Sequence, residues 1–354
     1  MKYIDGVTDK GIVLSPDKEG EAFYEWDGGG CREAILNKVG DIYYLNYDAA
    51  MPGKTHESYW NGFLAKSKDL KHWEKIGPNL LSSALTHPES NEIVYKDFCS
   101  ASSPWSRYEN GKWYHYYLGA DHCSPEGIPC FKYSTMLAES DTMEGLWSKK
   151  CDKEGCGKHV CFNVGEKGAW DDCTASPGEV LINPKWENDP DNEKKYLMFY
   201  SGSCWGETKR SVGIARADRL DLCDDYDKKE GNFWEKDPAP IIPPEHDIEN
   251  TSIFYEESSG IYWLFTNHIY NNEYTDSVWV YWSEEIDKWN PENRAVVIDS
   301  TVSTWAKGAI GMPAVIKTDE NTLSVLYDAV KGDGKGHLDR HIGLAEIKLP
   351  IKIK

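Results

Sequence analysis

The sequence predicts an all-β fold, a five-bladed β-propeller formed as one domain over residues 1–354. Three observations lead to this prediction. A strand pattern rich in aromatic and β-branched residues recurs five times, about 60 to 80 residues apart. A shorter apolar strand precedes each copy, and a third strand follows it. Long helical periodicity is nearly absent, which disfavours an α/β barrel.

Each repeat contains three predicted strands in the same order. The middle strands are expected at 41–47, 112–118, 195–200, 260–266 and 323–327. The strands before them, which would face the axis, are expected at 34–36, 104–106, 178–182, 252–255 and 313–316. The third strands are expected at 63–73, 136–141, 212–218, 278–283 and 342–345. Turn residues separate the strands, so each repeat is a small antiparallel sheet.

The net charge of the chain indicates which classes of partner it is unsuited to bind. Lys and Arg number 39 against 59 Asp and Glu, a net charge of −20, which repels phosphate backbones and anionic lipid headgroups. We therefore expect neither nucleic acid nor a membrane as partner, and the oligomeric state stays open. The first five residues lack the apolar segment of a signal peptide, so we expect a cytoplasmic protein.

Aromatic residues make up 13% of the chain, including 15 Trp and 21 Tyr. Rings that combine an apolar face with a polar group suit sugars, which present C–H faces and hydroxyl edges together. Trp and Tyr are also strong β-sheet formers. The composition is compatible with both interpretations, a sugar site and ordinary sheet packing.

Ten cysteines without a secretion signal are expected to be thiols. One group at short spacing raises the question of zinc: Cys151, Cys156, His159, Cys161 and Cys173. Because their gaps differ from the Cys-x2-Cys knuckle, we predict no metal site there.

Candidate catalytic residues lie where the chain enters the five inner strands, because these segments converge on the axis of a propeller. Four of the five segments carry a carboxylate: Asp27 or Glu33, Asp97, Asp171 or Asp172, and Glu249. Carboxylates in a confined site spread their pKa values, so that one gives a proton while another stays ionised. A glycosidic bond is cleaved by such a pair. Asp before a strand can also be an ordinary turn residue.

The repeat, the phrase at 64–74, the middle-strand phrases and the phrase at 248–254 together resemble the five-bladed β-propeller glycosidases. That group comprises glycoside hydrolase families 43, 32 and 68, with the family 130 phosphorylases more distant. The resemblance covers nearly the whole chain. It implies a carbohydrate substrate, with arabinofuranosidase or xylosidase activity favoured. It implies no required cofactor, although some members hold a structural calcium ion near the axis.

The resemblance to family 43 also implies roles for individual carboxylates. Glu249 matches the general acid, Asp172 the residue that modulates its pKa, with Asp171 as its rival, and Asp27 the general base. The sequence departs from the family at one point, because the first-blade Asp of family 43 precedes a proline, whereas here Glu33 precedes alanine. The base is therefore Asp27 or Glu33, and the neighbouring Arg32 is suited to a substrate hydroxyl or carboxylate.

Further residues are expected to contact the substrate. Asp97 is the candidate for binding a hydroxyl on the second blade. Trp26, Trp170 and Trp305 stand beside the carboxylate segments as candidate sugar platforms, and His268 and Arg340 are candidates from the last two blades.

Four activities fit these residues. An inverting hydrolase, as in family 43, would use the acid and base pair, and a retaining one, as in families 32 and 68, would use Asp27 as nucleophile. A phosphorylase would need a cationic pocket, for which Arg32 and Arg340 alone look central among seven arginines. A sugar-binding propeller without catalysis would keep the aromatic residues and tolerate loss of the acid.

Overall fold

The computed structural model describes residues 1–53, 60–88, 95–121, 133–150, 159–204, 209–225, 231–268 and 277–354. Within them the protein is all-β, as predicted. Helical structure in these ranges is confined to two four-residue helices, α1 (Tyr24–Asp27) and α2 (Ser83–Thr86), and one 3-10 turn, η1 (Pro244–His246). None of the described helices is long and apolar enough to cross a membrane.

The strands form five antiparallel groups, which we call units one to five. Unit one contains β2 (Gly30–Val39), β3 (Ile42–Ala50), β4 (Trp60–Ser67) and β5 (Glu74–Leu80). Unit two contains β6 (Ser100–Glu109), β7 (Lys112–Ala120), β8 (Tyr133–Ser140) and β9 (Ser148–Lys149). Unit three contains β11 (Thr174–Ser176), β12 (Val180–Ile182), β13 (Tyr196–Ser203), β14 (Arg210–Ala217) and β16 (Glu235–Lys236). Outside the units, β10 (His159–Val160) pairs with β15 (Asp224–Asp225).

Unit four contains β17 (Ile248–Glu256), β18 (Ile261–His268), β19 (Val278–Ser283) and β20 (Arg294–Ile298). Unit five joins both ends of the chain, because β21 (Ile310–Asp319), β22 (Thr322–Val330) and β23 (Arg340–Lys348) are completed by β1 (Val7–Leu14). The register of β1 against β23 runs from Val7 opposite Ile347 to Leu14 opposite Ile342. The sequence pattern predicted three strands in each repeat, and these fourth strands were not predicted.

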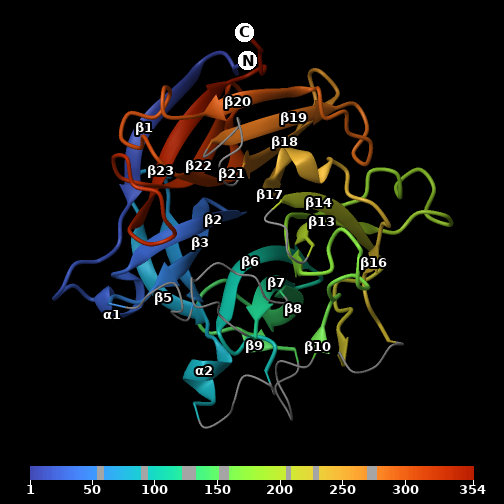
Figure 1. Ribbon diagram of the computed structural model, residues 1–354, viewed down its shortest axis with the longest axis horizontal. Coiled ribbons are helices and arrows are strands. Elements are labelled where there is room, and N and C mark those ends of the chain that lie inside the picture. The colour runs from blue at the N-terminus through green and yellow to red at the C-terminus, as the bar shows by residue number, and fades with distance from the viewer. Residues whose placement is uncertain are drawn as a thin grey trace.

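The units follow one another around the molecule in chain order (Figure 1). Short parallel contacts link units one to three into one sheet: β4 pairs with β6, and β8 pairs with β11. Each successive pair of units encloses a hydrophobic cluster, including Leu64 with Tyr117, Tyr116 with Met198, Phe199 with Leu264, Phe265 with Val325, and Leu326 with Leu45. The last cluster packs unit five on unit one, so the core runs through all five inter-unit layers.

The inner strands begin earlier than predicted, and three of them carry a β-bulge with a left-handed residue. The bulged residues are Glu33 in β2 (φ 54°), Ser103 in β6 (φ 49°) and Asn250 in β17 (φ 57°). A left-handed conformation is costly for residues other than glycine, and bulges of this kind redirect side chains next to active sites. The candidate carboxylates Glu33 and Glu249 therefore lie within the inner strands, on or beside the bulges.

Candidate active site

Glu33 lies on the bulge of β2 and is held from three sides. The Ser103 hydroxyl donates to its Oε2, and Arg32 Nη2 lies 3.4 Å from its Oε1. Its backbone N–H donates to Asp328 Oδ2 at 2.7 Å, which fixes the bulge. Burial raises the pKa of Glu33, but the charge of Arg32 and the Ser103 hydrogen bond outweigh burial, so the pKa is lowered overall. Glu33 is thus kept ionised.

Arg32 precedes Glu33 and joins several groups of the site. Its guanidinium carbon lies 3.9 Å from the ring centroid of Trp60, a cation–π contact. Its Nη1 lies 3.1 Å from Nδ1 of His337, and its Nη2 lies 3.6 Å from Asp48 Oδ2. These contacts hold the guanidinium in one position beside Glu33.

Glu249 is the carboxylate contributed by unit four, one residue before the bulge of β17. Arg210 Nη1 donates to Glu249 Oε2 at 2.6 Å. Burial raises the pKa of Glu249, Arg210 opposes this, and the charge of Glu33 adds to it, so the pKa is raised overall. The ion pair favours the carboxylate, yet desolvation is the larger effect. The two glutamates therefore have pKa values shifted in opposite directions.

Electrostatic contacts place Glu33 and Glu249 in one site. Each acts on the pKa of Tyr133, at the start of β8, as do Arg32 and Arg210. Burial raises the pKa of Tyr133, which keeps this phenol neutral. The side chains of Glu33 and Glu249 are 17% and 20% exposed, so a ligand can reach both.

Asp247 adds a third carboxyl near Glu249. It is buried, has a left-handed backbone (φ 50°), and its Oδ1 accepts a hydrogen bond from the Arg210 backbone N–H at 2.9 Å. Burial raises the pKa of Asp247 to about 6, and the charge of Glu249 contributes.

Unit five contributes Arg340 and Asp328, which form an ion pair of 2.7 Å. Gly311 in β21 makes room for this pair, because a Cβ there would clash with Asp328 Oδ1 and lie 2.5 Å from Arg340 Nη1. Arg340 also lowers the pKa of Glu33 by its charge. The structure thus brings Arg340 and Arg32 to Glu33, and both were predicted from the sequence to bind substrate.

Asp27, Asp97 and Asp171 occupy a different environment from Glu33. In units one, two and three each accepts a hydrogen bond from a tyrosine hydroxyl and pairs with a lysine ammonium at 2.5 to 2.6 Å. The sets are Asp27 with Tyr47 and Lys75, Asp97 with Tyr117 and Lys149, and Asp171 with Tyr200 and Lys236. We call them the Asp–Tyr–Lys locks.

The locks correct the expectation that these aspartates face a shared central site. All three carboxyls are buried, and each joins the segment before an inner strand to the middle and outermost strands of its own unit. Of the two first-unit candidates, the structure brings Glu33 to the site with Glu249, whereas Asp27 bonds within its lock.

Loss of one lock should destabilise the fold. In Asp97→Asn the ammonium of Lys149, only 9% exposed, would lose its charged partner, and we expect the free energy of unfolding to fall by about 3–5 kcal/mol. Chemical denaturation measures this change. The double variant with Lys149→Met should recover part of the loss, because it removes the uncompensated charge. Asp221→Asn, in the exposed pair with Arg219, should change stability little. An Asp97→Asn protein as stable as wild type would contradict this role.

The other predicted site residues lie as follows. Asp172 is buried before β11, where its Oδ2 accepts a hydrogen bond from Gly168 N–H at 2.7 Å, and its catalytic role stays a prediction. His268 is buried in unit four with Nε2 3.3 Å from the Tyr281 hydroxyl, and burial lowers its pKa to about 3. A neutral imidazole in this position packs within unit four.

The three tryptophans proposed as sugar platforms pack on hydrophobic cores. Trp26 lies against the cluster between units five and one, and Trp170 against the cluster between units two and three. Trp305 stacks on Tyr327 and donates its Nε1–H to the Tyr327 hydroxyl at 2.8 Å. For these three, the sheet-packing interpretation of the aromatic composition fits the structure.

The described residues contain no group of three or more His, Cys, Asp and Glu side chains placed to hold a metal ion. Of the cysteine cluster, Cys161 and Cys173 are buried thiols, whereas Cys151 and Cys156 lie outside the described residues. Cys99 is disulfide-bonded, contrary to the expectation of thiols throughout.

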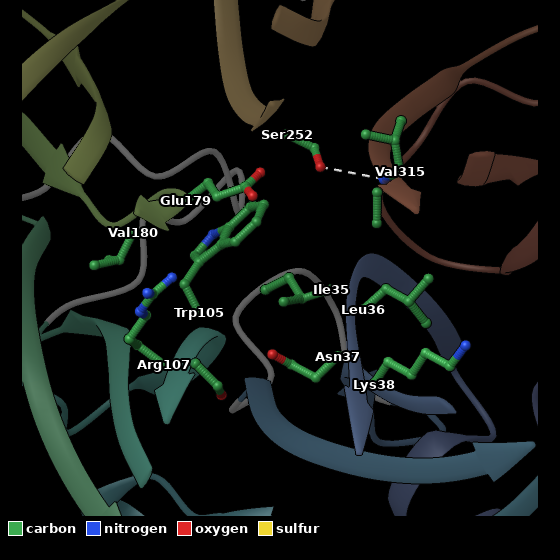
Figure 2. Close-up of a pocket in the computed structure, with 12 residues that line it drawn as sticks. Ile35, Leu36, Asn37, Lys38, Trp105, Arg107, Glu179, Val180, Ser252 and Val315 are labelled. Carbon is green, nitrogen blue, oxygen red and sulfur yellow. Dashed lines mark hydrogen bonds between the residues drawn. The ribbon is translucent and has the colours of Figure 1, made fainter. Parts of the chain in front are cut away.

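A cavity lies further along the same inner strands. Figure 2 shows this cavity of about 210 Å³, lined by residues that include Asn37, Trp105, Arg107, Glu179 and Ser252. Burial raises the pKa of Glu179 to about 7, although its Oε2 accepts a hydrogen bond from Ile253 N–H. The buried cluster of Ile35, Trp105 and Met312 follows the bulges of the inner strands. Glu179 therefore offers a partly buried carboxyl with a raised pKa apart from Glu33 and Glu249.

The residues near the two glutamates that were not predicted from the sequence include Asp48, Ser103, Arg210 and Tyr133. Ser103 had one signal, its place before a proline at the start of an inner strand, but a left-handed bulge is not readable from a single sequence. Arg210 and Tyr133 reach the site only because units two, three and four adjoin.

No protein-family model matches the sequence, and no curated protein matches it. Solved structures share its fold. A structure of a BT0996 RGII complex aligns over 97% of this chain and 92% of its own, with 17% identity and a TM-score of 0.69. Zg3597, a family 117 glycoside hydrolase of the marine bacterium Zobellia galactanivorans, aligns over 98% and 92%, with 16% identity and a TM-score of 0.62.

The Bacillus subtilis arabinanase Arb43A aligns over 92% of this chain and 97% of its own, with 15% identity and a TM-score of 0.56. Proteins of family 43 are among the structures with this fold. The resemblance to propeller-type glycosidases is therefore confirmed at the level of the fold.

Proposed function

We propose that this protein is a glycoside hydrolase in which Glu33 is the general base and Glu249 the general acid. The observation that carries the proposal is the pair of accessible glutamates in one site, one with a lowered pKa and the other with a raised pKa. An acid and a base with separated pKa values are what cleavage of a glycosidic bond requires.

The fold supports the proposal. We propose that the five units are the blades of a five-bladed propeller over residues 1–354, with β1 completing the fifth blade. The five inter-unit clusters support this arrangement, because each described unit packs on the next and the fifth packs on the first. A propeller brings the bulges of β2, β6 and β17 to its axis.

In the proposed reaction Glu249 protonates the glycosidic oxygen as the bond breaks, and Glu33 takes a proton from the attacking water. Each glutamate is held by its own arginine, and Tyr133 interacts with both pairs. The resemblance to family 43 favours the inverting route, in which the two carboxyls lie farther apart than in retaining enzymes. We therefore propose inversion, with Arg32 and Arg340 binding substrate oxygens.

The substrate proposed is a terminal arabinofuranose or xylose in an oligosaccharide or polysaccharide. Support comes from the neighbouring structures, which include an arabinanase and two α-L-arabinofuranosidases. Because side chains supply both proton transfers, we propose that the reaction needs no cofactor.

A panel of nitrophenyl arabinosides, xylosides, galactosides and mannosides, with and without phosphate, tests the function. Hydrolysis of one of them without phosphate is expected, with NMR showing the inverted anomer as first product. A rate that depends on phosphate would instead indicate a phosphorylase, for which Arg210 supplies a third arginine at the site. Binding without turnover of any glycoside would refute hydrolysis.

The pH dependence follows from the two pKa shifts. Glu33 must be ionised, and its lowered pKa keeps it so down to a lower pH than a free glutamate. Glu249 must be protonated, and its raised pKa keeps it so up to a higher pH. We expect a bell-shaped profile of kcat/KM that loses its alkaline limb in Glu249→Gln. An alkaline limb unchanged in that variant would assign the acid to another group.

A further inference from the structure

We propose that Asp48 stores a proton and, through the Ser103 hydroxyl, positions Glu33 for its reaction. Asp48 lies on β3, directly opposite Arg32 in the ladder, and is fully buried. Asp48 is a positioning residue in this proposal, because it has no surface from which to touch a substrate. The role assigned to Glu33 rests on the proposed function, whereas the proton on Asp48 does not.

The geometry around Ser103 requires one extra proton. The Ser103 hydroxyl contacts Glu33 Oε2 and also lies 3.1 Å from Asp48 Oδ2. A hydroxyl has one hydrogen and can donate to only one of two carboxylates. If both were ionised, one oxygen would face the hydroxyl oxygen without a hydrogen between them. A proton on Asp48 resolves this, because Asp48 then donates to Ser103, and Ser103 donates to Glu33.

The surroundings assign the extra proton to Asp48 instead of Glu33. Asp48 has 0% side-chain exposure, against 17% for Glu33. Its Oδ1 is already fixed by the Ser103 backbone N–H at 2.6 Å, which leaves Oδ2 to carry the hydrogen. Arg32 lies closer to Glu33 than to Asp48, at 3.4 Å against 3.6 Å, and Arg340 adds its charge at Glu33.

Burial and the charge of Glu33 favour the protonated form of Asp48. Burial and the charge of Glu33 raise the pKa of Asp48 well above its usual range, although Arg32 and Ser103 oppose the shift. The charge of Arg32, the Ser103 hydrogen bond and the charge of Arg340 in turn lower the pKa of Glu33. Asp48 neutral and Glu33 ionised is thus the consistent assignment.

The arrangement has a chemical consequence for Glu33. The chain Asp48–Ser103–Glu33 directs a hydroxyl hydrogen at Oε2, which fixes the carboxylate and leaves Oε1 toward Arg32. An ionised Asp48 would compete for the Ser103 hydrogen and place a second negative charge beside Glu33. Glu33 would then lose both its orientation and its lowered pKa.

Infrared difference spectroscopy tests the proton without using activity. At neutral pH, wild type should show the C=O stretching band of a protonated carboxylic acid. This band should be absent from Asp48→Asn and present in Glu33→Gln. Glu179→Gln is the matched control, because Glu179 is a different carboxyl with a raised pKa. A band lost in Glu33→Gln and kept in Asp48→Asn would place the proton on Glu33 and overturn the proposal, as would no band at either residue.

Kinetics test the positioning role. Asparagine matches a protonated aspartate, since its oxygen accepts from Ser103 N–H and its amide donates to the Ser103 hydroxyl. We expect Asp48→Asn to keep kcat/KM within about fivefold of wild type, whereas Ser103→Ala should lose about tenfold or more. Because Ser103 lowers the pKa of Glu33, Ser103→Ala should also move the acid limb of the profile to higher pH.

The two kinds of failure can be told apart. An Asp48→Asn enzyme as inactive as Glu33→Gln would mean that Asp48 works as a carboxylate, which overturns the stored proton. An unshifted acid limb in Ser103→Ala would overturn the relay through the hydroxyl. Normal activity of Glu33→Gln, with the Asp48 band present, would instead remove the proposed function of Glu33 while the proton assignment stands.

Discussion

Replacing Glu33 with glutamine is expected to lower kcat/KM by about 10²–10⁴-fold, the range for losing a general base. Glutamine keeps the shape and still accepts from Ser103, but it cannot take a proton from water. The loss should be similar for good and poor leaving groups, because the water must be activated in both cases. Steady-state kinetics on nitrophenyl and alkyl glycosides measure it.

The contrast with Asp27 makes this result decisive. Asp27 bonds to Tyr47 and Lys75 within its lock, so Asp27→Asn should lower thermal stability while the folded protein keeps its activity. If Glu33→Gln were active and a folded Asp27→Asn enzyme were inactive, the general base would be Asp27 instead of Glu33.

Replacing Glu249 with glutamine is expected to lower the rate on an unactivated glycoside by about a hundredfold or more. The leaving oxygen then departs without a proton, and the rate falls most for a leaving group whose conjugate acid is weak. The loss should therefore shrink on a nitrophenyl glycoside, whose leaving group needs little protonation. A comparison of the two substrate types measures this dependence.

Glu179→Gln is the matched control, because Glu179 is a partly buried glutamate with a raised pKa that lines a cavity to which neither Arg210 nor Arg32 contributes. Its kinetics should equal those of wild type. An equal loss for Glu249→Gln on both substrates would exclude general-acid catalysis by Glu249, and an unaltered rate would refute its role altogether.

Much of the fold is predictable because strand patterning is local. The strands at 42–50, 112–120 and 322–330 are buried along most of their length, and their apolar and aromatic runs recur along the chain. The outermost strands escaped prediction, since β9 and β16 have two residues each and β1 belongs to a sheet at the other end of the chain. A strand that is very short, or that pairs with a strand far away in the chain, gives no clear hydrophobic pattern in the sequence.

The site was less predictable because Asp27, Asp97 and Asp171 carry the same local signal as catalytic aspartates. Each precedes an inner strand and follows or adjoins an aromatic residue or lysine, which fits both a turn and an active site. The lysines of the locks come from outer strands about 50 to 65 residues later in the chain. No local pattern links these residues.

The sequence alone predicted a repeating β-structure and a carboxylate, Glu249, at the fourth inner strand. Its composition, with a net charge of −20, disfavours polyanionic partners. Three-dimensional packing placed Glu33 near Glu249, paired Asp27, Asp97 and Asp171 with lysines of their own units, and brought Arg210, Tyr133 and Asp48 to the glutamates. The reason is physical. Strand formation depends on neighbours in the chain, whereas the charge state of a carboxyl depends on burial and on cations contributed by distant strands.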